Sequence, residues 1–245
     1  MPGFDISDFI NKLIQLFAAI TALTLHEFAH AFSAYRLGDP TAKNQGRMSV
    51  NPMRHVRPLN LLIIIVLYVL IGLFSSWIPA FSKALDIMFL AAWVFMARPV
   101  PVNPFNLRPR KWGGSIVSAC GPLSNFLLAI VSAALFVVFF RLTFQWYDNT
   151  FISYISLFLS YLCYICITLG IFNLFPIPPL DGFGVIEPFF NRETREMIYR
   201  YYHFFMIGIF LLISSGLTSQ ILGTFVPKIY SGLIYFFDMI FGWIG

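Results

Sequence analysis

Charged residues are scarce in this chain of 245 residues: they make up 11% of it, against roughly a quarter in a typical soluble domain. A globule of this size could not cover its surface with so few solvated groups, which argues against a soluble enzyme, a disordered chain and a partner of nucleic acids. Hydrophobic residues make up 58% of the chain, 29 residues are Phe, and the mean hydropathy is +0.77. The composition therefore predicts an integral membrane protein.

Cysteines are few as well, and all three (Cys120, Cys163 and Cys166) lie in apolar stretches. Cys163 and Cys166 are three residues apart, so they share one face of a helix. We expect them to pack as small apolar side chains between helices, with a metal or redox role as the alternative. The first eight residues are acidic, and so lack the basic start of a cleavable signal peptide.

Several apolar segments are long enough to be considered as membrane-spanning helices, which need about 20 residues each. They are residues 10–37, 59–78, 84–97, 114–140, 151–174, 200–222 and 226–244. Segment 84–97 is short, so 59–97 either crosses the membrane twice or forms a re-entrant hairpin. The predicted fold class is an all-α polytopic membrane protein with about six to seven transmembrane segments. We expect one domain over residues 1–245, with a catalytic core at about 10–185 and a helical pair at about 199–244.

The basic residues predict the orientation of these segments. Linkers 36–57, 98–111 and 176–200 hold twelve of the sixteen Lys and Arg residues. Because cytoplasmic loops carry an excess of Lys and Arg, these linkers are expected on the cytoplasmic side. The Val-Asn-Pro pieces at 49–52 and 101–104 resemble each other, and they are predicted either to form a small β-hairpin at this face or to be two unrelated turns.

The first apolar segment carries the sequence His-Glu-Phe-Ala-His at residues 26–30. On a helix His26 and His30 lie on one face, one turn apart. Both imidazoles can then ligate a single zinc ion, with Glu27 beside them to take a proton from water. Three ionisable groups this close together are costly in an apolar segment without a ligand, so we interpret them as a metal site.

A zinc ion in a hydrolase needs three protein ligands and one open position, so a third ligand must lie elsewhere. Asp181 is the best candidate, because prolines at 176–179 break the helix of segment 151–174 just before it. A carboxylate left at membrane depth is tolerated only where protein or a water-filled cavity receives it. The alternative is a plain loop carboxylate. His55 and His203 are interpreted as interfacial side chains, with a conformational or linker role as the alternative for His55.

These residues resemble the site-2 protease family of intramembrane zinc metalloproteases, most closely its short bacterial members that lack PDZ and CBS domains. The matching stretches are residues 26–30, 37–47, 99–104, 121–125 and 173–182. The resemblance implies one zinc ion per chain with the ligands His26, His30 and Asp181. It implies a zinc metalloendopeptidase of the bacterial plasma membrane, with its active site towards the cytoplasm and a transmembrane protein or peptide as substrate.

The same resemblance assigns roles to three further residues. Glu27 is implied as the general base, and Asn173 and Asn125 as amides that orient the substrate or stabilise the oxyanion. Arg57 departs from the pattern, because relatives tend to carry an acidic residue there. A zinc transporter and an inactive scaffold are the alternatives. The chain shows no internal repeat of the kind common in transporters, and its motif is intact.

Overall fold

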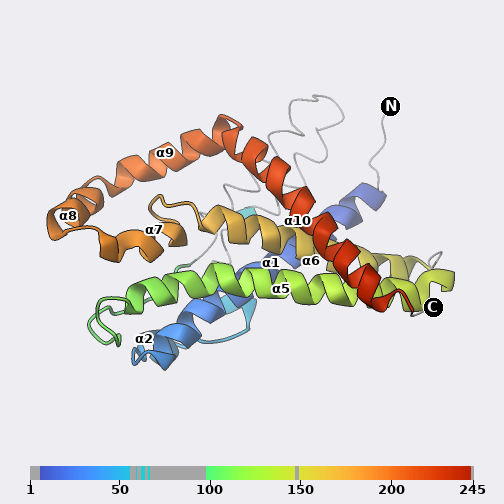
Figure 1. The fold of residues 1–245 in the computed structure, drawn as a ribbon, viewed down its shortest axis with the longest axis horizontal. Coiled ribbons are helices and arrows are strands. Elements are labelled where there is room, and N and C mark those ends of the chain that lie inside the picture. The colour runs from blue at the N-terminus through green and yellow to red at the C-terminus, as the bar shows by residue number, and fades with distance from the viewer. Residues whose placement is uncertain are drawn as a thin grey trace.

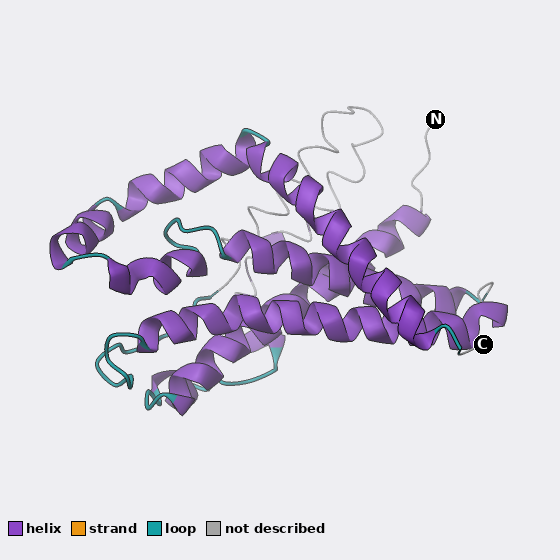
Figure 2. Cartoon of the chain, viewed as in Figure 1, coloured by secondary structure: helices purple, strands orange, loops and turns teal. Residues whose placement is uncertain are grey.

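The computed structural model describes residues 6–55, 98–146 and 149–243, together with residues 59, 62, 63 and 66. These residues form helices joined by loops and turns, and none of them belongs to a strand (Figure 1, Figure 2). The helices are α1 (Ile6–Arg36), α2 (Thr41–Asn44), α5 (Gly113–Thr143), α6 (Thr150–Asn173), α7 (Asp181–Ile186), α8 (Arg192–Arg200), α9 (Tyr202–Ser214) and α10 (Leu217–Phe241). The prediction of an all-α fold is confirmed for this part of the chain.

Helices α1, α5 and α6 pack against one another as the core, and α10 crosses over α5 and α6 (Figure 1). On α1 the side chains at the contact are small: Ala18, Ala19 and Ala22 are completely buried. Small side chains let helix backbones approach closely, which is how helices associate inside membranes. Cys163 and Cys166 are completely buried in the same cluster, which confirms that they pack as small apolar side chains.

Three helices of the described residues, α1, α5 and α6, are long and apolar enough to cross a membrane. The pair α8 and α9, bent by 67°, is a fourth if it counts as one span. These helices make the chain an integral membrane protein. The predicted six to seven segments are not reached in this part of the chain. Segments 59–78 and 84–97 lie almost entirely outside the described residues, so their number of crossings stays a prediction.

Helix α5 runs antiparallel to α1 and α6, so the C-terminal ends of α1 and α6 lie at the same end of the bundle (Figure 1). Two backbone hydrogen bonds tie this end together. Arg108 N donates to Leu37 O at 2.8 Å, and Arg98 N donates to His55 O at 2.9 Å. The chain therefore returns at Arg98 to the place that it left at His55. A residue near the end of α1, such as His30, and a residue just after α6, such as Asp181, can therefore share one site.

The predicted β-hairpin is wrong, because the Val-Asn-Pro pieces are turns. Asn51 Oδ1 accepts a hydrogen bond from Met53 N at 3.0 Å, and Asn103 Oδ1 accepts one from Phe105 N at 3.1 Å. A side chain that bonds the backbone two residues later bends the chain and takes the place of strand pairing. The two pieces therefore share a turn signal and not a strand.

The helical pair at the C-terminus divides at a different place from the predicted one. The break between α9 and α10 falls at Ser215 and Gly216, where Gly216 has a φ of +78° that glycine adopts without strain. The predicted break, between 222 and 226, lies inside α10. Pro227 also lies inside α10. A proline there removes one backbone hydrogen bond of the helix, a loss that packed membrane helices tolerate.

Candidate metal centre

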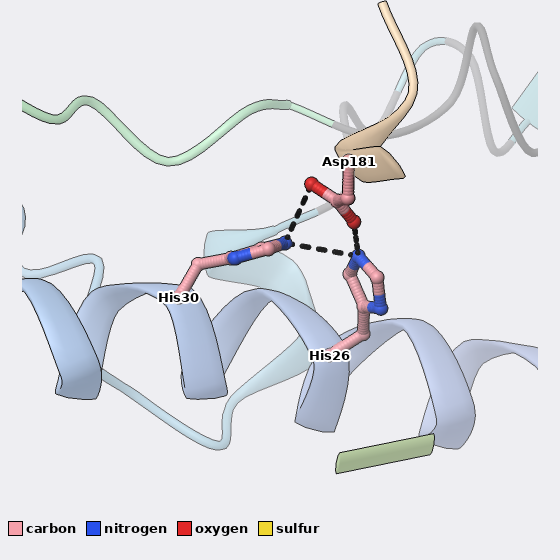
Figure 3. Close-up of side chains that lie close together, drawn as sticks. All are labelled: His26, His30 and Asp181. Carbon is pink, nitrogen blue, oxygen red and sulfur yellow. Dashed lines mark hydrogen bonds and ion pairs between the residues drawn. The ribbon is translucent and has the colours of Figure 1, made fainter. Parts of the chain in front are cut away.

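The two histidines of the motif lie on α1, which runs without interruption through both of them. Their side chains are on the same face, one turn apart, as the spacing predicts (Figure 3). Both residues are buried, with 5% of His26 and 8% of His30 exposed. Their Nε2 atoms are 3.0 Å apart, and the two rings meet edge to face. The arrangement directs two ring nitrogens at one point in space.

Asp181, at the start of α7, points its carboxylate at the same point (Figure 3). Its Oδ2 lies 3.0 Å from His26 Nε2, and its Oδ1 lies 3.3 Å from His30 Nε2. One ligand atom from each of the three residues falls within 4.8 Å of the others. Despite its short distance to His26, Oδ2 is buried without a partner in hydrogen-bonding geometry. A buried carboxylate oxygen with a free lone pair is what a cation site requires.

The turn between α6 and α7 brings Asp181 to the histidines. Helix α6 ends at Asn173, and the prolines that follow prevent it from continuing. The chain then folds back on the end of α6 so closely that a Cβ at residue 182 would lie 2.2 Å from Leu174 O. Only glycine fits there. Gly182 thus permits the tight turn that places its neighbour Asp181 beside the histidines.

Helix α5 forms the back of the centre. Gly121 faces the histidines so closely that a Cβ on it would lie 2.4 Å from His30 Nε2 and 2.7 Å from His26 Cε1. One turn before it, Val117 O is 2.8 Å from His30 Nδ1. One turn after it, Asn125 Nδ2 is 3.1 Å from His26 Nδ1. Residues four apart lie on one helix face, so a single stripe of α5 contacts the far nitrogen of each ring.

The proton positions on His30 fit a metal ligand. A backbone carbonyl only accepts hydrogen bonds, so the contact with Val117 O requires a proton on His30 Nδ1. The neutral ring then presents a lone pair at Nε2, towards Asp181 (Figure 3). Two imidazole nitrogens and one carboxylate form a donor set that suits Zn²⁺ and related divalent metal ions. The residues present therefore fit a metal ion.

A cavity of about 380 Å³ opens beside these three residues. Its walls come from α1, α5, α6, α9, the residues around Asp181 and the loop at residues 99–102. Glu27, which is 6% exposed, lines this cavity together with the two histidines. Glu27 is not among the three converging ligands, so its carboxylate faces the same space without belonging to the metal-binding group.

The two predicted asparagines lie in different surroundings. Asn173 lines the cavity, and its Nδ2 donates to Leu169 O at 3.1 Å. Asn125 is completely buried, does not line the cavity and contacts His26 instead. The structure thus leaves Asn173 beside the space for a substrate and separates Asn125 from it.

Two buried charges that the sequence analysis left without a role hold the wall of the cavity. Asp39 accepts hydrogen bonds from Asn103 N at 2.7 Å, from Asn106 Nδ2 at 3.0 Å and from Thr41. Burial raises the pKa of Asp39, but these hydrogen bonds outweigh it and hold the pKa below its usual value. Asp39 therefore fastens the 103–106 turn as a carboxylate.

Arg47 is the second of these charges. Its guanidinium donates to the carbonyl oxygens of Arg54 and Arg98 and lies 3.4 Å from that of Pro99. It is 4% exposed. Each charge stands beside a glycine, in Gly38-Asp39-Pro40 and Gly46-Arg47, within a chain that has few charges. A charged residue next to a turn-forming glycine, in a chain with so few charges, was the sequence feature that could have predicted the structural role of Asp39 and Arg47.

The interpretation of His55 as an interfacial side chain is wrong. His55 is completely buried, and its Nε2 bonds Ser49 O at 2.5 Å. Burial disfavours its charged form and keeps its pKa below the ordinary value. His203, in contrast, is exposed on α9 and contacts the ring of Tyr202. Neither side chain joins the group of His26, His30 and Asp181.

Comparison with known proteins agrees with this site. Peptidase family M50 matches residues 84–215, more than half of the chain, a range that includes Asp181 but not His26 or His30. "Putative zinc metalloprotease YwhC" of Bacillus subtilis is 29% identical over 222 residues, which are 91% of this chain and 90% of that protein. "Putative zinc metalloprotease Rip2" of Mycolicibacterium smegmatis is 30% identical over 199 residues, 81% of this chain and 66% of that protein. No solved structure matches the chain significantly. The family match and the resemblance of the motifs agree, and the chain belongs to peptidase family M50.

Proposed function

We propose that the chain is an intramembrane zinc metalloprotease that hydrolyses peptide bonds in or near transmembrane segments of other membrane proteins. The observation that carries this proposal is the convergence of His26, His30 and Asp181 beside a cavity that Glu27 also lines. The first three residues would hold the metal ion. The relatives' printed names support zinc as that ion, and so does the donor set.

Three protein ligands leave one coordination position for water or substrate, as a catalytic zinc site requires. When bound, zinc lowers the pKa of a water molecule towards 7 and polarises the peptide carbonyl. The protein supplies the remaining functions. Val117 and Asn125 contact the far nitrogens of the two imidazoles, and Gly121 keeps α5 close enough for both contacts.

Glu27 is proposed as the general base. Its carboxylate lines the cavity next to His26 and is not needed as a ligand. It would take a proton from the attacking water and pass it to the peptide nitrogen. The nitrogen needs this proton to leave as an amine. The buried position of Glu27 keeps bulk water away from this transfer.

Asn173 is proposed as the group that contacts the substrate carbonyl. One proton of its amide nitrogen is used by Leu169 O, and the second, which has no partner among the described residues, would donate to an oxyanion. Its place in the wall of the cavity, next to the turn that carries Asp181, supports this role.

The setting of the cavity supports a substrate from the membrane. Three of its walls come from α1, α5 and α6, the helices long enough to span a bilayer. Twelve of the sixteen basic residues lie in linkers 36–57, 98–111 and 176–200, and the eleven of them that the structure describes lie at the end of the bundle that holds the metal centre or beyond α7. We propose a bacterial plasma membrane with this end towards the cytoplasm.

The test compares metal content and cleavage in single variants of the purified chain. Glu27→Gln should keep about one zinc ion per chain and lose cleavage of a model transmembrane substrate by orders of magnitude. His26→Ala should lose both metal and cleavage, because two ligands hold zinc weakly. Glu193→Gln, on the exposed first turn of α8, is the matched control and should behave as the wild type.

The same variants separate a protease from a zinc transporter. A transporter would carry zinc across vesicle membranes with the Glu27→Gln chain as well as with the wild type, and no variant would cleave the substrate. Full cleavage by Glu27→Gln would remove Glu27 as the base and overturn the mechanism.

A further inference from the structure

Asn125 has an unusual environment for a polar side chain in a membrane-spanning helix. It lies in the middle of α5, is completely buried and does not line the cavity. Its amide nitrogen is 3.1 Å from His26 Nδ1, while its Oδ1 is buried without a hydrogen-bond partner among the described residues. An unsatisfied buried amide oxygen costs about 1–3 kcal/mol, so its retention calls for a reason.

The contacts of the two rings leave one nitrogen of His26 to Asn125. His30 Nδ1 carries a proton because it faces Val117 O, so the neutral ring presents its lone pair at Nε2. His26 Nε2 lies 3.0 Å from His30 Nε2 and 3.0 Å from Asp181 Oδ2, so it points at the same place. The remaining nitrogen, His26 Nδ1, lies 3.1 Å from the Asn125 amide.

Ligation of zinc requires a lone pair on His26 Nε2, so the proton of the neutral ring lies on Nδ1, which is then a donor. The group that faces Nδ1 must therefore accept. The oxygen and nitrogen of an asparagine side chain exchange places when the amide rotates by 180°, and the Asn125 oxygen is the atom that lacks a partner among the described residues.

We propose that Asn125 is a positioning residue whose amide oxygen accepts a hydrogen bond from His26 Nδ1 and so holds His26 Nε2 towards the metal ion. The inference rests on the metal centre of the proposed function. A leucine at this place offers no acceptor, whereas an ionised aspartate offers acceptors only.

A direct contact with substrate does not fit the same observations. Asn125 lies behind His26 as seen from the cavity, since it approaches Nδ1 while Nε2 points at Asp181. A purely structural role does not explain Asn125 either. Ser132 on the same helix, equally buried, satisfies its hydroxyl with its own backbone at Leu128 O and contacts neither histidine. Ser132 therefore provides a matched control.

The experiment measures zinc affinity, with no substrate present. The purified chain is stripped with a chelator, and zinc is titrated in competition with a chromophoric chelator. Asn125→Leu should bind zinc about 10–100-fold more weakly than the wild type, the usual cost of removing such a partner. Asn125→Asp supplies a permanent acceptor for Nδ1 and should bind at least as tightly as the wild type. Ser132→Ala should leave the affinity unchanged.

A spectroscopic measurement separates coordination from stability. Cobalt(II) in place of zinc should give the visible absorption of a tetrahedral site in the wild type and in Asn125→Asp, and an altered or weaker band in Asn125→Leu. The thermal unfolding temperature of each metal-free variant reports on folding. If Asn125→Leu does not fold, the contrast between Asn125→Asp and the wild type still decides, because loss of a purely structural donor would weaken the Asp variant.

The outcomes for this inference and for the proposed function differ. Equal affinity of Asn125→Leu and the wild type, or equally weak binding by Asn125→Leu and Asn125→Asp, overturns the acceptor role and leaves the proposed function standing. A wild-type chain that binds zinc but never cleaves a substrate overturns the protease and leaves the role of Asn125 intact. A wild-type chain that does not bind zinc overturns the metal centre on which both depend.

Discussion

Replacement of Gly121 by alanine should disable the metal centre without unfolding the protein. The added Cβ would lie 2.4 Å from His30 Nε2, whereas ordinary contacts of a Cβ begin at 3.4 Å. The ring or the helix must therefore move by about 1 Å, the difference between these two distances. Metal sites tolerate ligand displacements of only about 0.2 Å, so the required shift is roughly five times too large. We expect zinc affinity to fall about 100-fold or more, and cleavage to fall with it.

Gly114 on the same helix is the control for this substitution, because no atom lies within 4 Å of a Cβ placed there. Gly114 is the second residue of α5, where alanine fits the helical backbone, so Gly114→Ala should keep zinc binding and thermal stability. Zinc titration and thermal unfolding in detergent measure both variants. Wild-type zinc affinity in a folded Gly121→Ala chain would refute the claim that α5 touches the ligands.

Three further substitutions test other parts of the structure. Asp181→Ala should lose zinc and cleavage like His26→Ala, with residual weak zinc binding through the two histidines, measured by metal analysis after gel filtration. Cys166→Ala should leave zinc content and cleavage unchanged, because Cys166 packs only as a small apolar side chain; a loss of metal would restore the metal role. Asp39→Asn should lower the unfolding temperature most above pH 5 and progressively less below pH 4. The lowered pKa of Asp39 means that its stabilisation is complete above the unfolded-state pKa of about 3.9 and is lost as the pH falls through the folded-state value.

The ligands were predictable from local rules, and the structure brings the predicted three together. The helical period alone places His26 and His30 on one face. Asp181 required a longer argument, from the prolines that end α6 and from the cost of a carboxylate at membrane depth that nothing receives. Both steps depend on chemistry near the residue in question, which a single sequence expresses directly.

The role of α5 was not predictable in the same way. The sequence marks residues 121–125 as a motif, but the face of α5 that meets the histidines depends on how the helices pack. A buried amide can face either a substrate cavity or a ligand, and the spacing of the motif is the same in both cases. The contact of Asn125 with His26 and the close approach of Gly121 are therefore findings of the structure.

The errors at the loops have local causes. The Val-Asn-Pro pieces have the β-branched residues of strands, but their asparagine side chains bond the backbone two residues later and make turns. At the C-terminus, the break was predicted between residues 222 and 226, yet it lies at Gly216, where the backbone needs a positive φ. A glycine in this conformation commonly ends a helix, whereas Pro227 lies inside α10.

The depth of the centre in the bundle follows from the same geometry and bears on how a substrate could reach it. His30 lies six residues before Arg36, the last residue of α1, which is about 9 Å along the helix axis. The hydrocarbon core of a bilayer is about 30 Å thick, so the centre lies in its outer third if Arg36 marks the border. Asp181 and the segment held by Asp39 and Arg47 enclose the centre at this depth. For the proposed intramembrane protease, only the last turns of a transmembrane substrate would then need to unwind, because the centre is nearer to that border than to the middle of the membrane.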